Sequence, residues 1–223
     1  VIDPGDGGAY AVTIDPADFS STVDHPFLPK LPGTVWVYEA RPSDSEVEII
    51  TVEVLDERRT VMGVETIVVH DVVTTLDGTL VEDTFDWFAQ DADGNVWNFG
   101  EDTTSYEDGV ASEAGAWEAG VDGALPGIVM PAEPALTELG YRQEFLPGEA
   151  EDMGQVIALS GSASVPAGDY TDVIVTRDWT PLEADVVEEK TYARGVGFVH
   201  ETKTATGDGS SEVVELVDFS EPS

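Results

Sequence analysis

The sequence contains no cysteine, only three histidines, and only nine lysines and arginines among its 223 residues. The lack of cysteine excludes disulfides, thiolate metal sites and a cysteine nucleophile. The shortage of cations argues against nucleic acid and anionic membranes as partners, because phosphate recognition needs clustered Lys and Arg. No apolar run reaches the roughly 18 residues of a membrane span, so no transmembrane segment is predicted. Nucleophile-elbow, P-loop and dinucleotide-binding motifs are also missing.

Carboxylates, in contrast, are abundant, and 46 Asp and Glu give a formal net charge of −37. They run from Asp3 to Glu221 beside Val, Trp and Phe that can form a core, which predicts a folded acidic domain rather than a disordered chain. Self-repulsion opposes a compact state, and salt screens it over a Debye length of roughly 3 Å at 1 M. We therefore expect a salt-adapted protein, with a calcium-loaded exported protein and ordinary acidic bias as the alternatives.

Two regions differ in composition. Residues 1–24 are rich in Asp, Gly, Ala and Ser, which predicts a flexible acidic leader. Together with the absence of a starting Met, this indicates a secreted or cell-surface protein, with a lipid anchor through a removed N-terminal segment as one option. A trimmed chain would look the same. Residues 25–223 predict a single β domain that opens with Pro26, Pro29 and Pro32, which exclude helix.

Strand patterns fill most of that domain. Residues 46–55 alternate acidic and aliphatic side chains, a period of two that marks a half-buried strand. Asp77-Gly78 and Asp208-Gly209 are hairpin signals. We predict an all-β fold, a curved antiparallel sheet of about 9–12 strands that closes into a barrel or half barrel. The predicted strands are 34–39, 46–55, 66–73, 80–90, 96–99, 140–145, 155–165, 170–179, 186–193, 197–204 and 212–219.

The middle of the domain lacks this periodicity. Residues 107–140 are rich in Gly, Ala and Pro and predict one long loop over the mouth of the barrel. Long connections of this kind are usually either functional or disordered. Trp117, Ile128 and Met130 argue against disorder, so we expect an ordered loop.

Three segments resemble exported bacterial and archaeal β-rich proteins. They read LPGTVWVY at 31–38, DGNVWNFG at 93–100 and YARGVGFV at 192–199. The resemblance covers most of the chain after residue 25. It implies an exported fold similar to lipocalins and lipoprotein carriers, with a concave ligand face, and it attaches no activity.

The scarce ionisable residues are the candidate catalytic groups. His70 and His200 each precede a carboxylate on a predicted strand. They could act as acid or base, or bind a metal if the strands are neighbours. Arg142 could hold a substrate carboxylate bidentately beside Tyr141 and Glu144. That set would suit a polysaccharide lyase acting on uronate sugars. The structural alternatives are solvated strand histidines and a cross-strand ion pair of Arg142.

Two further patterns are candidate binding sites. Asp91, Asp93 and Asn95 carry the oxygen ligands of a calcium loop, but the twelfth position holds Asp102 instead of the bidentate Glu, and a plain hairpin turn explains them as well. Calcium is therefore the one candidate cofactor, and none is certain. Aromatic residues are the second pattern and could line a site for a small molecule or oligosaccharide, or belong to the core. They are Trp87, Trp97, Trp117 and Tyr141.

Three functions remain open from the sequence. The first is an exported, salt-adapted domain that binds a small or oligomeric ligand on an aromatic-lined concave face. The second is a small carbohydrate-active enzyme, most plausibly the lyase. The third is a cell-surface structural protein.

Overall fold

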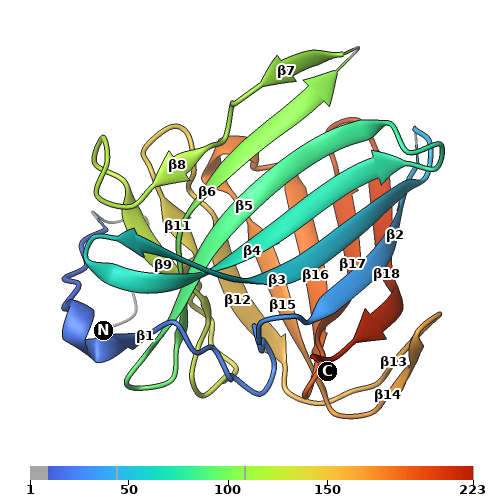
Figure 1. The fold of residues 1–223 in the computed structure, drawn as a ribbon. Helices are drawn as coiled ribbons and strands as arrows, with labels where there is room; N and C mark the ends of the chain where they lie inside the picture. The colour runs from blue at the N-terminus through green and yellow to red at the C-terminus, as the bar shows by residue number, and fades with distance from the viewer. Residues whose placement is uncertain (1–9, 44, 108, 223) are drawn as a thin grey trace.

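The computed structural model describes residues 10–43, 45–107 and 109–222, and this part of the chain is almost entirely β (Figure 1). Within it, helix is confined to two 3-10 turns, η1 (Pro16–Asp18) and η2 (Pro181–Glu183). The long strands are β2 (Val35–Pro42), β3 (Glu48–Val61), β4 (Val64–Thr75), β5 (Leu80–Asp91), β6 (Val96–Glu107), β9 (Leu125–Met130), β12 (Met153–Ala158), β15 (Val173–Trp179), β16 (Val186–Ala193), β17 (Gly197–Ala205) and β18 (Ser211–Ser220). The short ones are β1 (Phe19–Ser20), β7 (Val110–Ser112), β8 (Trp117–Glu118), β10 (Tyr141–Arg142), β11 (Glu144–Phe145), β13 (Ala163–Val165) and β14 (Gly168–Tyr170).

The sheet curves until its two ends almost meet. Its order is β10-β12-β15-β16-β17-β18-β2-β3-β4-β5-β6-β9-β11, and the neighbouring pairs are antiparallel. The ends are β10 and β11, which follow each other in the chain, so the short segment 141–145 joins one edge to the other. Gly127 allows this approach, because a Cβ there would lie 2.4 Å from the carbonyl carbon of Gln143. The predicted curved antiparallel sheet that closes into a barrel is confirmed.

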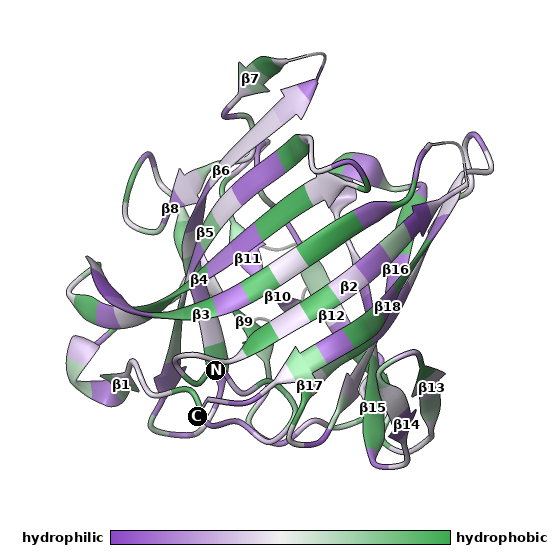
Figure 2. Ribbon diagram, turned by 45° about the vertical axis from the view of Figure 1, so that its right-hand side comes forward, coloured by the Kyte–Doolittle hydropathy of each residue, from purple (hydrophilic) through white to green (hydrophobic). Residues whose placement is uncertain are grey.

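The strand register decides which side chains face inward. Residues directly opposite each other in a sheet share a face. One inward row crosses β15, β16, β17, β18 and β2 and comprises Thr176, Lys190, Glu201, Val214 and Ala40. Figure 2 shows the alternation of hydrophobic and hydrophilic residues along β2–β5 that this arrangement requires. The same period of two therefore produces both the strands and the lining of the barrel.

Two hydrophobic clusters stabilise the fold. The first includes Trp36, Tyr38, Ile174 and Leu216. The second packs around β5, β6 and β8 and includes Trp87, Phe99, Trp117 and Ile128. Burial of large apolar side chains of this kind contributes roughly 1.5–3 kcal/mol each. Leu28 and Tyr192 of the first cluster, with Phe88, Val129 and Phe198 packed against it, also line the cavity described below.

The segment before the first long strand is part of the fold. Sequence composition predicts a flexible leader over 1–24, of which residues 1–9 lie outside the described part of the chain. Residues 10–24 instead lie against the barrel: β1 pairs with β5, and Val23 is fully buried and bridges to Lys30. Figure 1 shows this segment crossing one end of the barrel before β2. Phe27 and Leu28 extend the same packing, so hydrophobic contact outweighs the polar composition.

Residues 107–140 are more regular than a long loop. Their described part contains β7 and β8, which pair with β6, and β9, which lies between β6 and β11. Pro126 and Gly127 lie inside β9, where both residues usually weaken a strand. The close approach of β9 to segment 141–145 explains the glycine. Residues 113–116, 119–124 and 131–140 lie outside these strands.

Candidate functional site

All three lysines of the sequence lie at the inner face of the barrel. Lys190 and Lys203 point inward from β16 and β17, opposite Glu201 and Glu188 respectively. Lys30 reaches inward from the segment that crosses the barrel end, and its Nζ lies 5.2 Å and 5.3 Å from the ring centres of Trp36 and Phe88. The arginines Arg41 and Arg194, by contrast, pair with exposed or half-exposed carboxylates away from this interior. Because the chain has so few cations, the presence of all three lysines at the inner face makes the interior a candidate functional site.

Two of these lysines, Lys30 and Lys190, line an interior cavity of about 300 Å³. Residues from the crossing segment, β5, β9, segment 141–145, β15, β16 and β17 all contribute to its walls. Its polar lining is Lys30, Gln143, Asp178, Lys190 and Glu201. Its apolar lining is Leu28, Phe88, Val129, Tyr192 and Phe198. A concave site with apolar walls and a few convergent polar groups is the usual form of a small-molecule pocket.

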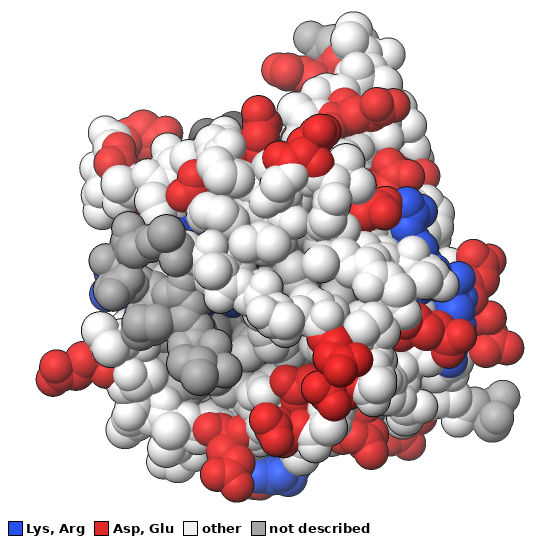
Figure 3. All heavy atoms as spheres, turned by 90° about the vertical axis from the view of Figure 1, so that its left-hand side faces the viewer, with Lys and Arg blue, Asp and Glu red and all other residues white. Residues whose placement is uncertain are grey.

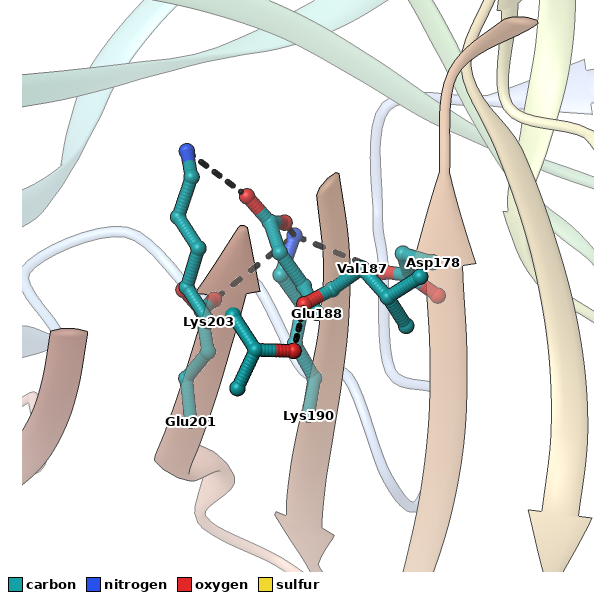
Figure 4. Close-up of polar contacts among 7 residues, drawn as sticks. Asp178, Val187, Glu188, Lys190, Glu201 and Lys203 are labelled. Carbon is teal, nitrogen blue, oxygen red and sulfur yellow. Dashed lines mark hydrogen bonds and ion pairs between the residues drawn. The ribbon is translucent and has the colours of Figure 1, made fainter. Parts of the chain in front are cut away.

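Lys190 is the centre of the polar lining. Its Nζ lies 2.8 Å from Glu188, 3.4 Å from Asp178 and 3.8 Å from Glu201 (Figure 4). Lys203 adds a second ammonium group, 3.1 Å from Glu188. Burial lowers the pKa of Lys190, but the three carboxylates outweigh burial and hold that pKa well above its usual value. Burial alone would raise the pKa of Glu188, yet Lys190 and Lys203 lower it to about 2.

Three buried polar atoms near Lys190 lack a partner with hydrogen-bond geometry. They are Oδ1 of Asp178, Oγ1 of Thr176 and the hydroxyl of Tyr141. Asp178 is 4% exposed and lines the cavity, and its other oxygen faces Lys190. An unsatisfied buried polar atom costs about 1–3 kcal/mol. Of these three residues only Asp178 lines the cavity; burial raises the pKa of its carboxyl group, and the side chains of Lys190, Thr176 and Gln143 oppose the rise.

A second group of acidic side chains extends from this cavity toward β5 and β6. Asp86 lies opposite Glu101 on the sheet, and Asp71 faces the same interior from β4. Burial is the main cause of every pKa shift in this group, and neighbouring carboxylates add to it: the pKa of Glu101 rises to about 9 and that of Asp71 to about 7. Burial likewise raises the pKa of Asp86 to about 6, although Lys30 opposes the rise.

Glu144 belongs to this acidic group and was predicted as a site residue. Burial and nearby Asp152 raise its pKa to about 8, while a hydrogen bond from Nε1 of Trp117, at 3.1 Å, opposes the rise. Glu201, on the other side of the interior, is also raised by burial, to about 7. The interior thus holds more carboxyl groups than its three lysines can neutralise.

The structure separates the other predicted catalytic residues. Tyr141 faces Gly154 on the inner surface. Arg142, its neighbour, is buried against Phe145, with its guanidinium carbon 4.9 Å from the ring centre, and donates to the carbonyl of Glu151. Arg142 therefore lies at the barrel seam, outside the lining of the cavity.

The two strand histidines lie on the outer face. His70 alternates with the inward Val69 and Asp71, stacks on Phe85 at 4.3 Å and contacts Oδ1 of Asp83 at 2.6 Å. His200 alternates with the buried Val199 and Glu201 on β17. His70, Tyr141 and Arg142 are thus not brought together around one substrate position.

The three predicted tryptophans belong to the second hydrophobic cluster instead of the interior cavity. Each is at least nine-tenths buried. Nε1 of Trp97 donates to Asp91 at 2.8 Å, and the guanidinium of Arg59 lies 3.9 Å above Trp87. Trp87 and Trp117 also line a separate surface depression of about 320 Å³ beside Arg59. Tyr141 belongs to the same cluster, and none of the four predicted ligand-binding residues lines the interior cavity.

The predicted calcium loop forms a hairpin turn. The carboxylate of Asp91 accepts hydrogen bonds from the backbone of Asp93 and Asn95, the side chain of Asn95 and the indole of Trp97. These donors use the oxygens that a cation would need. Among the described residues, no group of three or more His, Asp or Glu is arranged to hold a metal ion.

Sequence reasoning missed the residues that form the cavity. Lysine is as rare in this chain as histidine, with three of each, and this rarity was an available signal. Glu188, Lys190 and Tyr192 also recur with a period of two, which predicts one face of a strand. What the sequence could not supply was the direction of that face, because either side of a curved strand can be the inner one.

Comparisons with known proteins give little further guidance. No known protein family and no curated protein matches the chain. Two crystal structures show a distant similarity in shape, an inferred lipoprotein from Parabacteroides distasonis ATCC 8503 and an inferred exported protein with a YmcC-like fold from Bacteroides fragilis NCTC 9343. The first is 14% identical with a TM-score of 0.47 and covers 87% of this chain and 98% of its own; the second is 13% identical with a TM-score of 0.47 and covers 87% and 99%. These low values assign this chain neither a family nor a function.

The described residues contain no helix that is long and apolar enough to span a membrane.

Proposed function

We propose that this protein is a binding domain that holds a small molecule in the interior of its barrel. The observation that carries the proposal is the interior cavity, which combines apolar walls with five polar residues, among them Asp178, whose buried Oδ1 has no partner at hydrogen-bond geometry. Buried polar groups in folded proteins are normally satisfied. A ligand that supplied the missing partner would offset its cost and gain apolar contact from the rings around it.

The size of the cavity favours a compact ligand. About 300 Å³ is at the lower end of the range for small-molecule pockets. A long oligosaccharide would need an extended open groove, and the segment that crosses one barrel end limits the space available. A small molecule is therefore the better occupant.

Binding is favoured over catalysis by the arrangement of the ionisable groups. A lyase would need an acid or base and a carboxylate-binding arginine around one substrate position. Tyr141 faces inward, whereas Arg142 packs at the seam and His70 lies on the outer face. The cavity itself offers an ion-pair network, which suits recognition.

The expectation of a secreted or cell-surface location rests on the sequence, through its acidic composition and the three segments that resemble exported proteins. We keep it as part of the proposal. Fractionation of the source cells, with immunodetection of the protein, tests it: a signal confined to the cytoplasmic fraction would exclude export.

The binding proposal is tested with the neutral fluorescent probe N-phenyl-1-naphthylamine. We expect saturable fluorescence enhancement with wild-type protein. Val129→Phe adds a ring to the cavity wall and should weaken probe binding at least about tenfold, a loss of roughly 1.4 kcal/mol. Because the added ring fills space, this loss should occur with an unchanged melting temperature or a small change only.

The matched control is Val110→Phe, since Val110 lies on β7 and is 70% exposed, outside the barrel interior. It should bind the probe like wild type. Equal binding by Val129→Phe and wild type, or no saturable binding by wild type, would contradict a ligand site in this cavity.

A further inference from the structure

We infer that the ligand of the interior cavity is an organic cation, a protonated primary amine on a compact apolar or aromatic body. This inference rests on the proposed function and specifies its chemistry. The features that carry it are the Asp178 carboxylate oxygen that lacks a partner at hydrogen-bond geometry, the excess of carboxylates around Lys190, and the aromatic residues of the same cavity lining.

Charge is the first step. Lys190 alone faces Asp178, Glu188 and Glu201 within 4 Å, and Lys203 reaches only Glu188 of these three. Two ammonium groups therefore face three carboxylates at this wall. Uncompensated charge is costly in a partly buried site, so a further cation is the complement that the site lacks.

Hydrogen bonding is the second step, and it is independent of charge. Asp178 lines the cavity, and its buried Oδ1 has no partner at hydrogen-bond geometry among the described residues, while Oδ2 lies toward Lys190. Burial raises the pKa of Asp178, and the side chains of Lys190, Thr176 and Gln143 oppose the rise. A primary ammonium group carries three N–H donors. The Asp178 carboxylate can accept one of them in a charge-assisted bond.

The other residues of the cavity lining indicate the rest of the ligand. Phe88, Phe198 and Val129 also line the cavity and offer no charge. Lys30 already lies over the Phe88 ring, so this wall accepts a cation at its face. An apolar or aromatic body bearing one ammonium group fits both halves of the lining.

An anionic ligand fits the same cavity poorly. The ammonium of Lys190 is already surrounded by carboxylates. Burial lowers the pKa of Lys30, and the nearby carboxyl groups of Asp86 and Asp71 oppose this change. A ligand carboxylate would add a negative charge to an interior in which carboxyl groups already outnumber lysines. The two lysines in the lining thus neutralise the protein's own acids.

The test uses three ligands with one body and different head groups: 4-phenylbutylamine, 4-phenylbutanol and 4-phenylbutyrate. Each is titrated at pH 7.5 into wild-type protein carrying N-phenyl-1-naphthylamine, with displacement as the readout. We expect the amine to bind at least about tenfold more tightly than the alcohol, and the butyrate to bind most weakly.

Two variants locate the effect. Asp178→Asn and Glu201→Gln keep the shape of the wall and remove one negative charge each, and both should reduce the advantage of the amine over the alcohol severalfold. Glu183→Gln, on the exposed turn η2, is the matched surface control and should leave the ratio unchanged. Reading a ratio of two ligands makes the result insensitive to partial loss of folded protein.

The outcomes distinguish a failure of the inferred ligand class from a failure of the proposed binding function. If the alcohol or the butyrate binds as tightly as the amine, the cationic class is wrong and the binding cavity stands. If the amine is preferred but Asp178→Asn and Glu201→Gln keep the full preference, the assigned wall is wrong. If no ligand displaces the probe and the probe itself does not bind, the binding function fails as well.

Discussion

At the scale of single residues, the interior of this barrel is dominated by a few buried charges. Lys190 is held between three carboxylates, and removing one partner of such a network typically costs 3–5 kcal/mol, because the other charges stay buried. On β5 and β6, Asp86 and Glu101 lie opposite each other, and burial raises the pKa of both.

The pH dependence follows from the raised pKa values. Burial raises the pKa of Glu101 to about 9 and that of Glu144 to about 8, so the folded protein binds protons that the unfolded chain has released. Their contribution to stability is complete below the ordinary carboxyl pKa and is lost as the pH rises through these folded values. We expect the free energy of unfolding to fall between pH 6 and pH 9, when measured by denaturant titration in 2 M NaCl.

Glu101→Gln isolates one of these groups. The variant should be more stable than wild type at pH 9 by about 1–3 kcal/mol, with a flatter profile between pH 7 and pH 9, because a neutral amide needs no proton. Glu183→Gln on η2 is the exposed control and should retain the wild-type slope. An unchanged slope in Glu101→Gln would show that this carboxyl group is not the source.

At the scale of elements, the alternation of residues with a period of two predicted several long strands correctly, but it missed β9 at the seam of the sheet. The predicted strands 80–90, 186–193 and 197–204 coincide closely with β5, β16 and β17. β9 was missed because Pro126 and Gly127 lie within it, and those residues usually end strands. They are tolerated here because β9 lies next to the two-residue strand β11 at the seam.

The seam itself gives a prediction. Gly127→Ala should destabilise the protein by about 1–3 kcal/mol or more, since the added methyl would lie 2.4 Å from the Gln143 carbonyl carbon and 2.7 Å from the Arg142 carbonyl oxygen. Both contacts are to backbone, so a side-chain rotation cannot relieve them. Thermal unfolding monitored by circular dichroism measures the effect.

Gly161→Ala provides the matched control for the seam. A Cβ at Gly161 would meet only a methyl group of Val173, at 3.4 Å, which is ordinary contact. This variant should therefore unfold within a few degrees of wild type. Equal melting temperatures for both variants would mean that the seam is looser than described.

At the scale of the whole molecule, the surface charge is the main influence. Figure 3 shows one face on which acidic side chains clearly outnumber basic ones, in accord with the net charge of −37. Repulsion among these groups opposes the compact state, and salt screens it. Several of the few arginines pair across strands, as Arg41 does with Glu215, but such exposed pairs contribute little.

The salt prediction belongs to this scale. Melting temperature should rise clearly between 0.1 M and 2 M NaCl and rise similarly in KCl, since screening depends on ionic strength. A rise that requires only micromolar calcium would favour the calcium-loaded alternative, and a flat response to all three would leave ordinary acidic bias. The pH and salt effects are separable, because the raised carboxyl groups are inside the barrel.

The sequence by itself determined the strands, the hairpins, the acidity and hence the barrel, because alternation and turn residues act over a few neighbouring positions. It also contained the three lysines, but it could not show where their side chains point. Only the tertiary structure decided that Lys30, Lys190 and Lys203 point inward while His70 and His200 point outward, since a period of two defines two faces and curvature selects one. Closure of the sheet then placed Asp178, Gln143 and Phe88, which lie far apart in the chain, around one cavity.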